Sequence, residues 1–367
     1  MDLDCDVTQH NQEEREIHSG ASGVVGTDER GFRSFLKAGR RVPKNLPQRT
    51  ISQHVRVSRE FEGFLRESAK KSFEDATGND ARRFIKHLAK SNRNNWDNLI
   101  VLLRYSRFAG NEAVELEMLK ILDGAKVFDL LTDAVRSEVG REKADRILAG
   151  FNAPALGTSP KLIPKVTKRF METLESNLDQ NTCRGILLTG PHAGPPEAYA
   201  DERKLLRRSK NVDEYLKKRR QNFVKELSDH RKNNTLFFNQ RIDATALEFV
   251  KSNPEVAGGV RKGDKIYLTK IPYMMIEHLA ERDKKLSRYY YCHCPLARES
   301  ILSGPEISRN FCYCSAGYEK RPFDVAFGKS VKAEVLQSVL WGDPICRFSI
   351  EIPKEYLTAV RADRTRK

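Results

Sequence analysis

The hydrophobic periodicity of the chain changes near Thr235, and this change limits the folds that the chain can adopt. Before that point, apolar residues recur at helical spacing, and Phe61, Phe64 and Leu65 fall on one face of such a segment. After it, short runs rich in β-branched and aromatic residues alternate with helical segments. The sequence therefore predicts an α+β protein. An N-terminal helical bundle is followed by a C-terminal α/β domain with a mainly antiparallel sheet.

Breaks in the pattern divide the chain further. Glycine and proline cluster in residues 151–165, which is typical of a linker. The expected segments are a disordered basic and polar tail (1–55), a helical domain (56–150), the linker (151–165), a basic helical segment (166–232) and an α/β domain (233–367).

Individual elements of the last domain can be predicted as well. TLFFNQRI (235–242) and KIYLTKIP (265–272) have the composition of strands, and RYYYCHC (288–294) is also prone to β-structure. AGYEKRPFDVAFG (316–328) has a helical pattern. SVKAEVLQSVLWGD and ICRFSIEIP, which end the domain, are predicted to form a hairpin.

The charge balance of the chain is basic, with a formal net charge of +15 at pH 7. Such a charge favours binding to polyanions. No apolar run approaches the roughly 20 residues that a membrane span needs, so we expect no membrane association. The N-terminal stretch MDLDCDVTQHNQEERE is acidic and polar, which is not typical of a signal or transit peptide. We therefore expect a cytoplasmic protein.

Four of the seven cysteines form two Cys-x-Cys pairs, Cys292 with Cys294 and Cys312 with Cys314, and Cys346 lies in the last predicted strand. Thiolates bind soft or borderline metals, and four of them suit tetrahedral zinc or an iron–sulfur cluster. In a regular strand the two thiols of such a pair lie roughly 6 to 7 Å apart, so one metal could bind both only where the backbone bends. The alternative is a set of buried core cysteines, and the clustering favours a site.

Carboxylates near these cysteines are candidates for proton transfer. Glu299 follows the first pair, next to Arg298, which could hold an anion, and Glu334 lies in a strand-like run. Either carboxylate could complete a metal site or activate a metal-bound water. The alternative for each is a solvated or ion-paired surface group. His293, between the first two cysteines, could equally be a ligand or a hydrogen-bonded histidine.

The stretch FCYCSAGYEKRPFDVAFGKSVKAEVLQSVLWGDPICRFSIEIP, which begins at Phe311, is more specific. It resembles the C-terminal half of 4-vinyl-reductase-like small-molecule-binding domains and of the related L-2-amino-thiazoline-4-carboxylate hydrolase-like prokaryotic proteins. The shared features are Cys with Gly-Tyr, an acidic residue, and then Gly-Asp-x-x-Cys-x-Phe. The resemblance covers the C-terminal third of the chain. It implies a prokaryotic α/β domain that binds a hydrophobic small molecule and, in some members, zinc held by cysteines and a glutamate.

Carried over to this chain, the resemblance implies that Cys346, Glu334 and one cysteine of the second pair are zinc ligands. The chain departs from the zinc-binding members at Ser338, where they have another cysteine. The first Cys-x-Cys pair could supply the missing thiolate.

The leading hypothesis is therefore a metal-binding protein that binds or hydrolyses a small organic molecule. Zinc is the expected metal, with an iron–sulfur cluster as the alternative. The expected ligands are Cys292, Cys294, Cys312 and Cys314, with Cys346 and Glu334 in reserve. Glu299 or Glu334 would transfer protons in an enzyme. Four thiolate ligands would saturate the metal and make it structural, whereas three would leave an open catalytic position.

Two other hypotheses remain. Residues 203–232 are rich in Lys and Arg, and Arg207, Arg208, Lys217 and Lys218 are the expected contacts if the protein binds nucleic acid and the metal is structural. A solvated helix face is the alternative interpretation of these cations. The third hypothesis is a redox-sensing module in which a Cys-x-Cys pair is oxidised and reduced without metal. The substrate and the oligomeric state cannot be predicted.

Overall fold

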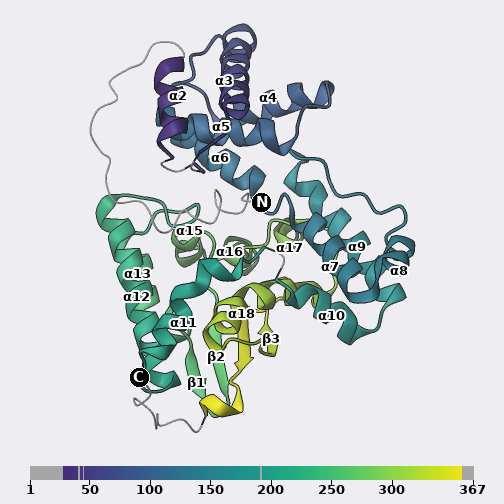
Figure 1. The fold of residues 1–367 in the computed structure, drawn as a ribbon, viewed down its shortest axis with the longest axis vertical. Coiled ribbons are helices and arrows are strands. Elements are labelled where there is room, and N and C mark those ends of the chain that lie inside the picture. Colours follow the sequence, from purple (N-terminus) through teal and green to yellow (C-terminus); the bar gives the residue numbers. More distant parts are fainter. Residues whose placement is uncertain (1–27, 40–41, 44, 191, 358–367) are drawn as a thin grey trace. The chain divides into compact units, whose positions relative to one another are not determined.

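The computed structural model describes residues 28–39, 42–43, 45–190 and 192–357. The chain divides into two compact units (Figure 1). The first unit ends at Ala125 and also contains Pro154–Ser159. The second unit contains Lys126–Ala153 and the chain from Pro160 onward.

The first unit is helical in its described part. Its helices are α2 (Glu29–Ala38), α3 (Gln48–Ala69), α4 (Gly78–Lys90), α5 (Trp96–Ala109) and α6 (Glu112–Leu122). Capping side chains determine where several of these helices begin. Asp28 accepts a hydrogen bond from the Gly31 N–H at the start of α2, and Thr77 and Asp80 form a capping box at the start of α4.

The core of the first unit is aromatic and also contains polar groups. All ten residues of α5 from Asn98 to Arg107 are buried. The rings of Phe61 and Phe84 stack with their centroids 4.8 Å apart. Arg104 Nη1 lies 2.7 Å from His54 Nε2. Burial, and then the Arg104 charge, lower the pKa of His54 to about 4, so this imidazole is neutral in the folded protein at neutral pH.

The described part of residues 1–55, which the sequence predicts to be a disordered tail, contains α2 and the first residues of α3. Phe32 and Leu36 of α2 are completely buried. The Phe32 ring packs edge-on against Tyr105, with 4.9 Å between the ring centroids. This helix is short and carries few apolar residues, so its stability depends on tertiary packing and not on a periodic pattern. Residues 1–27 lie outside the described residues.

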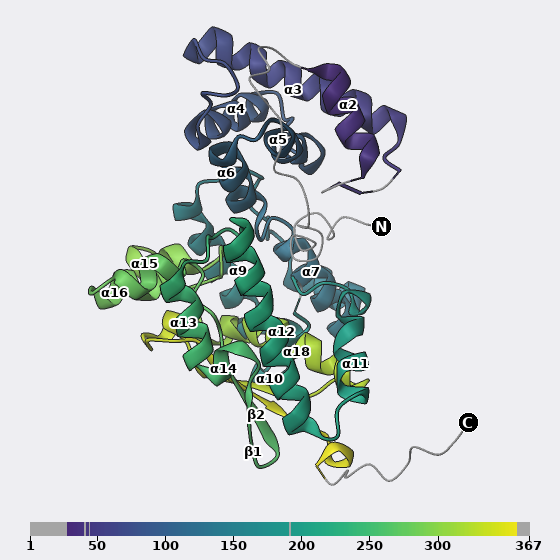
Figure 2. The same cartoon turned by 90° about the vertical axis from the view of Figure 1, so that its left-hand side faces the viewer.

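The second unit combines many helices with a small sheet. Its first helices are α7 (Val127–Val139), α8 (Arg141–Ile147), α9 (Ile163–Asn177), α10 (Gln180–Leu188), α11 (Ala200–Arg207), α12 (Val212–Asn233), α13 (Ala244–Ser252) and α14 (Pro254–Ala257). The later helices are α15 (Met275–Ala280), α16 (Lys284–Tyr291), α17 (Arg298–Leu302) and α18 (Tyr313–Phe327). Short 3₁₀ helices are η2 (Pro160–Leu162), η3 (Pro196–Tyr199), η4 (Arg309–Cys312), η5 (Val339–Trp341) and η6 (Lys354–Tyr356). The long helix α12 runs beside α13 and α14 (Figure 2).

The strands of the second unit are β1 (Val260–Lys262), β2 (Lys265–Thr269), β3 (Ala333–Gln337) and β4 (Arg347–Glu351). They form a four-stranded sheet in the order β1-β2-β4-β3, and every pair is antiparallel. Apolar residues of the sheet, such as Ile266 and Phe348, share a core with Phe323 and Phe327 of α18. The N-terminal end of α18 lies near the loop that enters β4, since Cys312 Sγ is 3.0 Å from Ser338 Oγ.

The predicted α+β class is confirmed, with a mostly helical N-terminal region and an antiparallel sheet mixed with helices in the C-terminal region. The predicted strand at 265–272, the helix at 316–328 and the pairing of the last two strands are also found as β2, α18 and the β3–β4 pair. The helices α7 and α8, expected in a 56–150 domain, belong to the second unit. Phe128 of α7 packs against Phe170 of α9, with 5.6 Å between their ring centroids.

Two predicted strands are wrong. Residues 288–294 begin inside α16, because Asp283 caps that helix by accepting hydrogen bonds from the Lys285 and Leu286 N–H groups. Residues 235–242 form a loop that contains a single bridge, between Phe237 and Gln240. Aromatic composition favours strands only where the chain can pair with a neighbouring strand.

Among the described helices, none combines the length and the apolar composition that crossing a membrane requires.

Candidate functional site

The structure brings five cysteines from three separate segments into one region, which we call the thiol centre. It consists of Cys292 and Cys294 after α16, Cys312 and Cys314 at the start of α18, and Cys346 before β4. Cys294 and Cys346 pack against both the small apolar cluster that contains Cys292 and the larger core that contains Cys314. Burial raises the pKa of Cys294 well above its usual value, and thiolate charges on Cys292 and Cys314 would raise it further. Burial also raises the pKa of Cys312, and a thiolate charge on Cys346 would raise it further.

The thiol centre is largely shielded from solvent. Cys292 and Cys314 are 5% and 3% exposed, and the other three cysteines are half-buried. Burial raises the pKa of both Cys314 and Cys346 to about 12. The thiols therefore remain protonated at neutral pH unless a bound cation displaces their protons.

The backbone around Cys292 and Cys294 bends instead of running as a strand. Cys292 is the C-terminal cap residue of α16. The Cys294 carbonyl then accepts hydrogen bonds from the N–H groups of Ala297 and Arg298, at 3.2 and 2.9 Å. The expected bend in this Cys-x-Cys pair therefore comes from a helix end followed by a turn.

Ser338 contributes a hydroxyl to the thiol centre. Its Oγ lies 3.0 Å from Cys312 Sγ and accepts a hydrogen bond from the Leu340 N–H at 3.1 Å. The Ser338 N–H donates to the Asp343 carboxylate at 2.9 Å, which makes Asp343 a turn residue. Ser338 thus lies beside Cys312, one of the predicted ligands.

Two cations flank the thiol centre. The Lys270 ammonium lies 3.1 Å from Ser315 Oγ and 3.5 Å from a Glu319 oxygen, and its side chain is 10% exposed. The Lys270 N–H also donates to the Cys346 carbonyl at 2.9 Å. The Lys270 charge lowers the pKa of Cys314 in part, opposing the larger effect of burial.

Arg298 is the second cation, and Glu299 lies beside it. The Arg298 guanidinium lies 4.5 Å from the ring centroid of Tyr273 and 5.2 Å from that of Tyr289. The Tyr289 hydroxyl donates to Glu299 Oε1 at 2.7 Å. Burial, and then this hydrogen bond, raise the pKa of Tyr289 to about 12. Tyr289 also packs against the small apolar cluster that contains Cys292, so Glu299 is connected to the edge of the thiol centre through this tyrosine.

Glu334 is placed differently from the cysteines. It lies on the exposed face of β3, whereas its neighbours Ala333 and Val335 are buried. Its carboxylate accepts a hydrogen bond from the Tyr313 hydroxyl at 2.6 Å. Glu334 is thus adjacent to the segment that carries the second Cys-x-Cys pair, but on the solvent side of it.

His192 belongs to the thiol centre, although its sequence context gave it no role. Its Nδ1 lies 3.4 Å from Cys314 Sγ, a contact between residues 122 positions apart. Its ring stacks on that of Tyr318, with 5.3 Å between the centroids. Burial, and then the Lys270 charge, lower the pKa of His192 to about 3, so the imidazole is neutral. His293, in contrast, lies with Nε2 2.5 Å from the Ile271 carbonyl oxygen.

These protonation states limit the chemistry of the site. A cysteine attacks as its thiolate, and a cationic imidazole is one neighbour that stabilises this form. The Cys314 thiol and the His192 imidazole are both neutral, so they do not form such a pair. Neutral imidazole and cysteine sulfur are instead the donors of zinc and iron sites. Among the described residues, no group of three or more His, Cys, Asp or Glu side chains is already arranged to hold a metal ion. Metal binding would therefore require the thiols to move closer together.

The basic residues expected to contact nucleic acid are partly used in the fold. Arg207, Arg208 and Lys217 are exposed. Lys218 forms an ion pair with Glu214 at 2.9 Å and donates to the Arg208 carbonyl at 2.8 Å. Fewer Lys and Arg side chains of α11 and α12 are therefore exposed than the sequence of these helices suggests.

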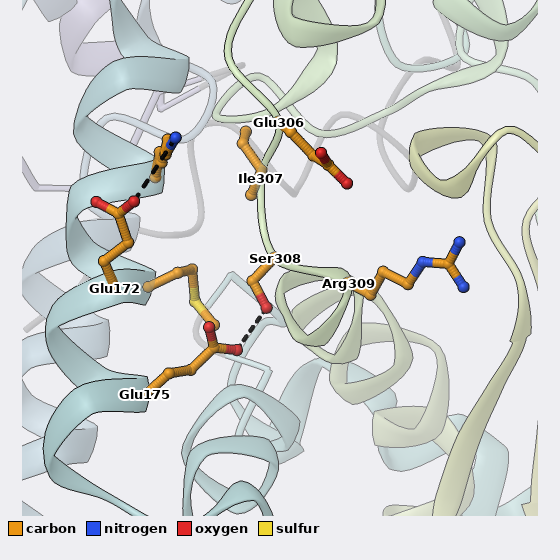
Figure 3. Close-up of a pocket in the computed structure, with 8 residues that line it drawn as sticks. Glu172, Glu175, Glu306, Ile307, Ser308 and Arg309 are labelled. Atoms are coloured by element: carbon orange, nitrogen blue, oxygen red, sulfur yellow. Dashed lines mark hydrogen bonds and ion pairs between the residues drawn. The ribbon is translucent and has the colours of Figure 1, made fainter.

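A surface pocket of about 280 Å³ lies between α9 and the segment before α18 (Figure 3). Its lining consists of Lys168, Met171, Glu172, Glu175, Glu306, Ile307, Ser308 and Arg309. The Ser308 hydroxyl donates to Glu175, and the Arg309 side chain points away from that glutamate (Figure 3). None of the predicted site residues lines this pocket.

Comparison with known proteins gives one match. A model of DUF6144, a family of unknown function, matches residues 278–357. No curated protein and no solved structure matches the chain. The matched segment contains all five cysteines of the thiol centre, but not His192 or Lys270. The C-terminal region of the chain is thus similar to this family over the segment that carries its cysteines.

Proposed function

We propose that the thiol centre binds a thiolate-ligated metal, zinc or an iron–sulfur cluster, and that the metal serves a site for a small organic molecule. The observation that supports this proposal is that five of the seven cysteines lie in or against two adjoining apolar clusters of the second unit. Core packing alone would not require cysteines from three segments to meet. Thiolates are the donors preferred by zinc and by iron–sulfur clusters.

The charges around the thiol centre support this proposal. Four thiolates around one Zn²⁺ carry a net charge of about −2, as do four thiolates around an oxidised four-iron cluster. Lys270 and Arg298 are cations close to the thiols, and both act on the pKa of Cys292. Lys270 already forms an ion pair with Glu319, and a metal–thiolate group would add a negative charge near both cations.

The resemblance to 4-vinyl-reductase-like proteins is compatible with the same site. It implies a sulfur ligand where this chain has Ser338, and the Ser338 hydroxyl lies 3.0 Å from Cys312 Sγ. In a hydrolytic protein, Glu299 is the better placed of the two candidate proton-transfer groups, because Glu334 is on the exposed face of β3. A structural metal would leave Glu299 as a hydrogen-bond acceptor for Tyr289.

Cobalt titration of the metal-free protein tests the proposal. Under anaerobic conditions, Co²⁺ bound by thiolates gives near-ultraviolet charge-transfer bands, which should saturate at one equivalent. Replacing Cys312 and Cys314 by Ser should abolish these bands. The matched control is Cys183→Ala, because Cys183 is buried in the same unit but outside the thiol centre. A parallel reconstitution with iron and sulfide separates the two metals by a brown chromophore. Absence of both signals in the wild-type protein would overturn the proposal.

Nucleic-acid binding is the second candidate function. It is supported by the exposed cations Arg207, Arg208 and Lys217 at the junction of α11 and α12. Phosphate contacts weaken steeply as salt rises. Replacing these three residues by Ala should weaken binding to DNA or RNA and lower the salt dependence. Equal binding by the variant and the wild type across a salt series would exclude this surface.

A further inference from the structure

Arg298 is held between two tyrosine rings. Its guanidinium carbon lies 4.5 Å from the ring centroid of Tyr273 and 5.2 Å from that of Tyr289. Each ring is tied to the fold by its hydroxyl. Asn239 Nδ2 donates to the Tyr273 hydroxyl at 2.8 Å, and the Tyr289 hydroxyl donates to Glu299 at 2.7 Å. Stacking on two anchored rings holds the planar guanidinium in one orientation.

This guanidinium has fewer partners than its charge and its donors would permit. A guanidinium is always cationic and carries five N–H donors. The Tyr273 hydroxyl accepts one hydrogen bond from Arg298. The Arg298 Nε is shielded from solvent without a hydrogen-bond partner, and no carboxylate in the described part of the chain forms an ion pair with this residue. Arg219, another half-buried arginine of the same unit, instead pairs with Glu202 at 2.9 Å.

An oriented cation without an ionic partner is suited to an anionic ligand. The fork of a guanidinium matches the two oxygens of a carboxylate. Arg298, Tyr289 and Tyr290 are half-buried, so this side of the cluster reaches solvent. The rings of Tyr289 and Tyr290 lie 5.8 Å apart between their centroids and offer an aromatic surface for the rest of a ligand. The Glu299 carboxylate would repel a second negative charge, which favours a monoanion over a phosphate dianion.

We infer that Arg298, stacked between Tyr273 and Tyr289, binds the carboxylate of a small aromatic acid. This inference rests on the small-molecule part of the proposed function and names the charge class of that molecule. The Arg298 N–H donates to the Cys294 carbonyl at 2.9 Å, so a ligand on this residue would lie next to the thiol centre. The contacts that orient the guanidinium come from tyrosines, so the site does not require a metal.

Titration of the full-length protein with benzoate, followed by saturation-transfer NMR, tests this site. Benzamide has nearly the same shape but no charge, so it should bind at least tenfold more weakly. Arg298→Gln should weaken benzoate binding roughly tenfold or more, because charge-assisted bidentate contacts are lost, and should leave benzamide unchanged. The matched control is Arg309→Gln. Arg309 is exposed, and its guanidinium lies 5.7 Å from the Trp341 ring, so this variant should bind both compounds as the wild type does.

Arg298→Lys is the second variant. It keeps a positive charge at this position but loses the planar fork, so benzoate affinity should fall between those of the wild type and Arg298→Gln. The same titration of the variant with Cys312 and Cys314 replaced by Ser should still show benzoate binding. Equal binding of benzoate and benzamide, unchanged binding in Arg298→Gln, or no saturable binding to the wild type would overturn the inference. None of these results alters the metal assays, so a failure of this site differs from a failure of the metal site.

Discussion

Replacing Gly317 by Ala tests the packing that holds the loop after α10 against α18. In a helix interior, Gly→Ala normally stabilises a protein by roughly 0.5–1 kcal/mol, because glycine loses more backbone entropy on folding. At Gly317 the added Cβ would lie 2.7 Å from two backbone atoms, and backbone atoms cannot rotate away as a side chain does. Overpacking of this kind costs about 1–3 kcal/mol. We therefore expect a net loss of stability in Gly317→Ala.

Gly185 in α10 is the matched control. A Cβ at Gly185 has no atom within 4 Å, and the residue is exposed. Gly185→Ala should therefore raise stability by up to about 1 kcal/mol, so the two substitutions should have opposite signs. Urea denaturation followed by circular dichroism measures the difference. Hydrogen exchange of the peptide that covers residues 183–194 should increase in Gly317→Ala alone. If both variants are stabilised to the same extent, the close approach of the two backbones is not present in solution.

Three further predictions concern stability. The free energy of unfolding of the first unit should fall by about 3 kcal/mol as the pH is lowered from about 6.5 to about 4, because His54 takes up a proton in the unfolded chain but stays neutral when buried. In pH-dependent denaturation, His54→Leu should flatten this slope. Ser338→Ala should lower the free energy of unfolding by about 1 kcal/mol, because it removes buried hydrogen bonds. Ser338→Cys should keep the fold and bind zinc more tightly in a chelator competition. Weaker binding by the Cys variant would place position 338 outside the metal site. Hydrogen bonds from Arg347 lower the pKa of Glu255, so this pair stabilises the fold above the usual carboxyl pKa and loses that effect as the pH falls below it. Arg347→Met should therefore lower the free energy of unfolding by about 1 kcal/mol at pH 7, and this loss should disappear at a pH where Glu255 is protonated.

The fold class could be predicted because strand-like segments such as β2 occur only after Thr235, although the sheet itself begins at Val260. β2 and α18 carry strong local patterns, and they form where they are expected. The segment 288–294 could not be assigned correctly from its tyrosines, because the Asp283 cap decides its conformation. α2 was missed for a related reason. Its two buried residues, Phe32 and Leu36, are too few for a periodic signal, and their burial depends on Tyr105 in a distant helix.

The cysteines of the candidate site could be found from their spacing, since all five lie within the last third of the chain. His192 could not be found in this way. It is 122 positions from Cys314, and its surroundings, GPHAGPPEAY, indicate only a break between helices. The informative residues are Gly190 and Gly317, whose contact exists only in three dimensions. Glu334 has the composition expected of a ligand, but strand alternation places it on the exposed face of β3.

The metal content of the protein as isolated, purified without oxygen and without added metal, is the sharpest test of the proposed metal site. Inductively coupled plasma mass spectrometry and a sulfide assay on the same sample would measure zinc, iron and acid-labile sulfide per chain. If the thiol centre holds a metal, the sample should contain one zinc per chain, or iron with a matching amount of sulfide. That metal should be lost when Cys312 and Cys314 are replaced by Ser, and retained in Cys183→Ala. Wild-type protein with less than about a tenth of an equivalent of any of these metals, and with five free thiols in the centre, would contradict it.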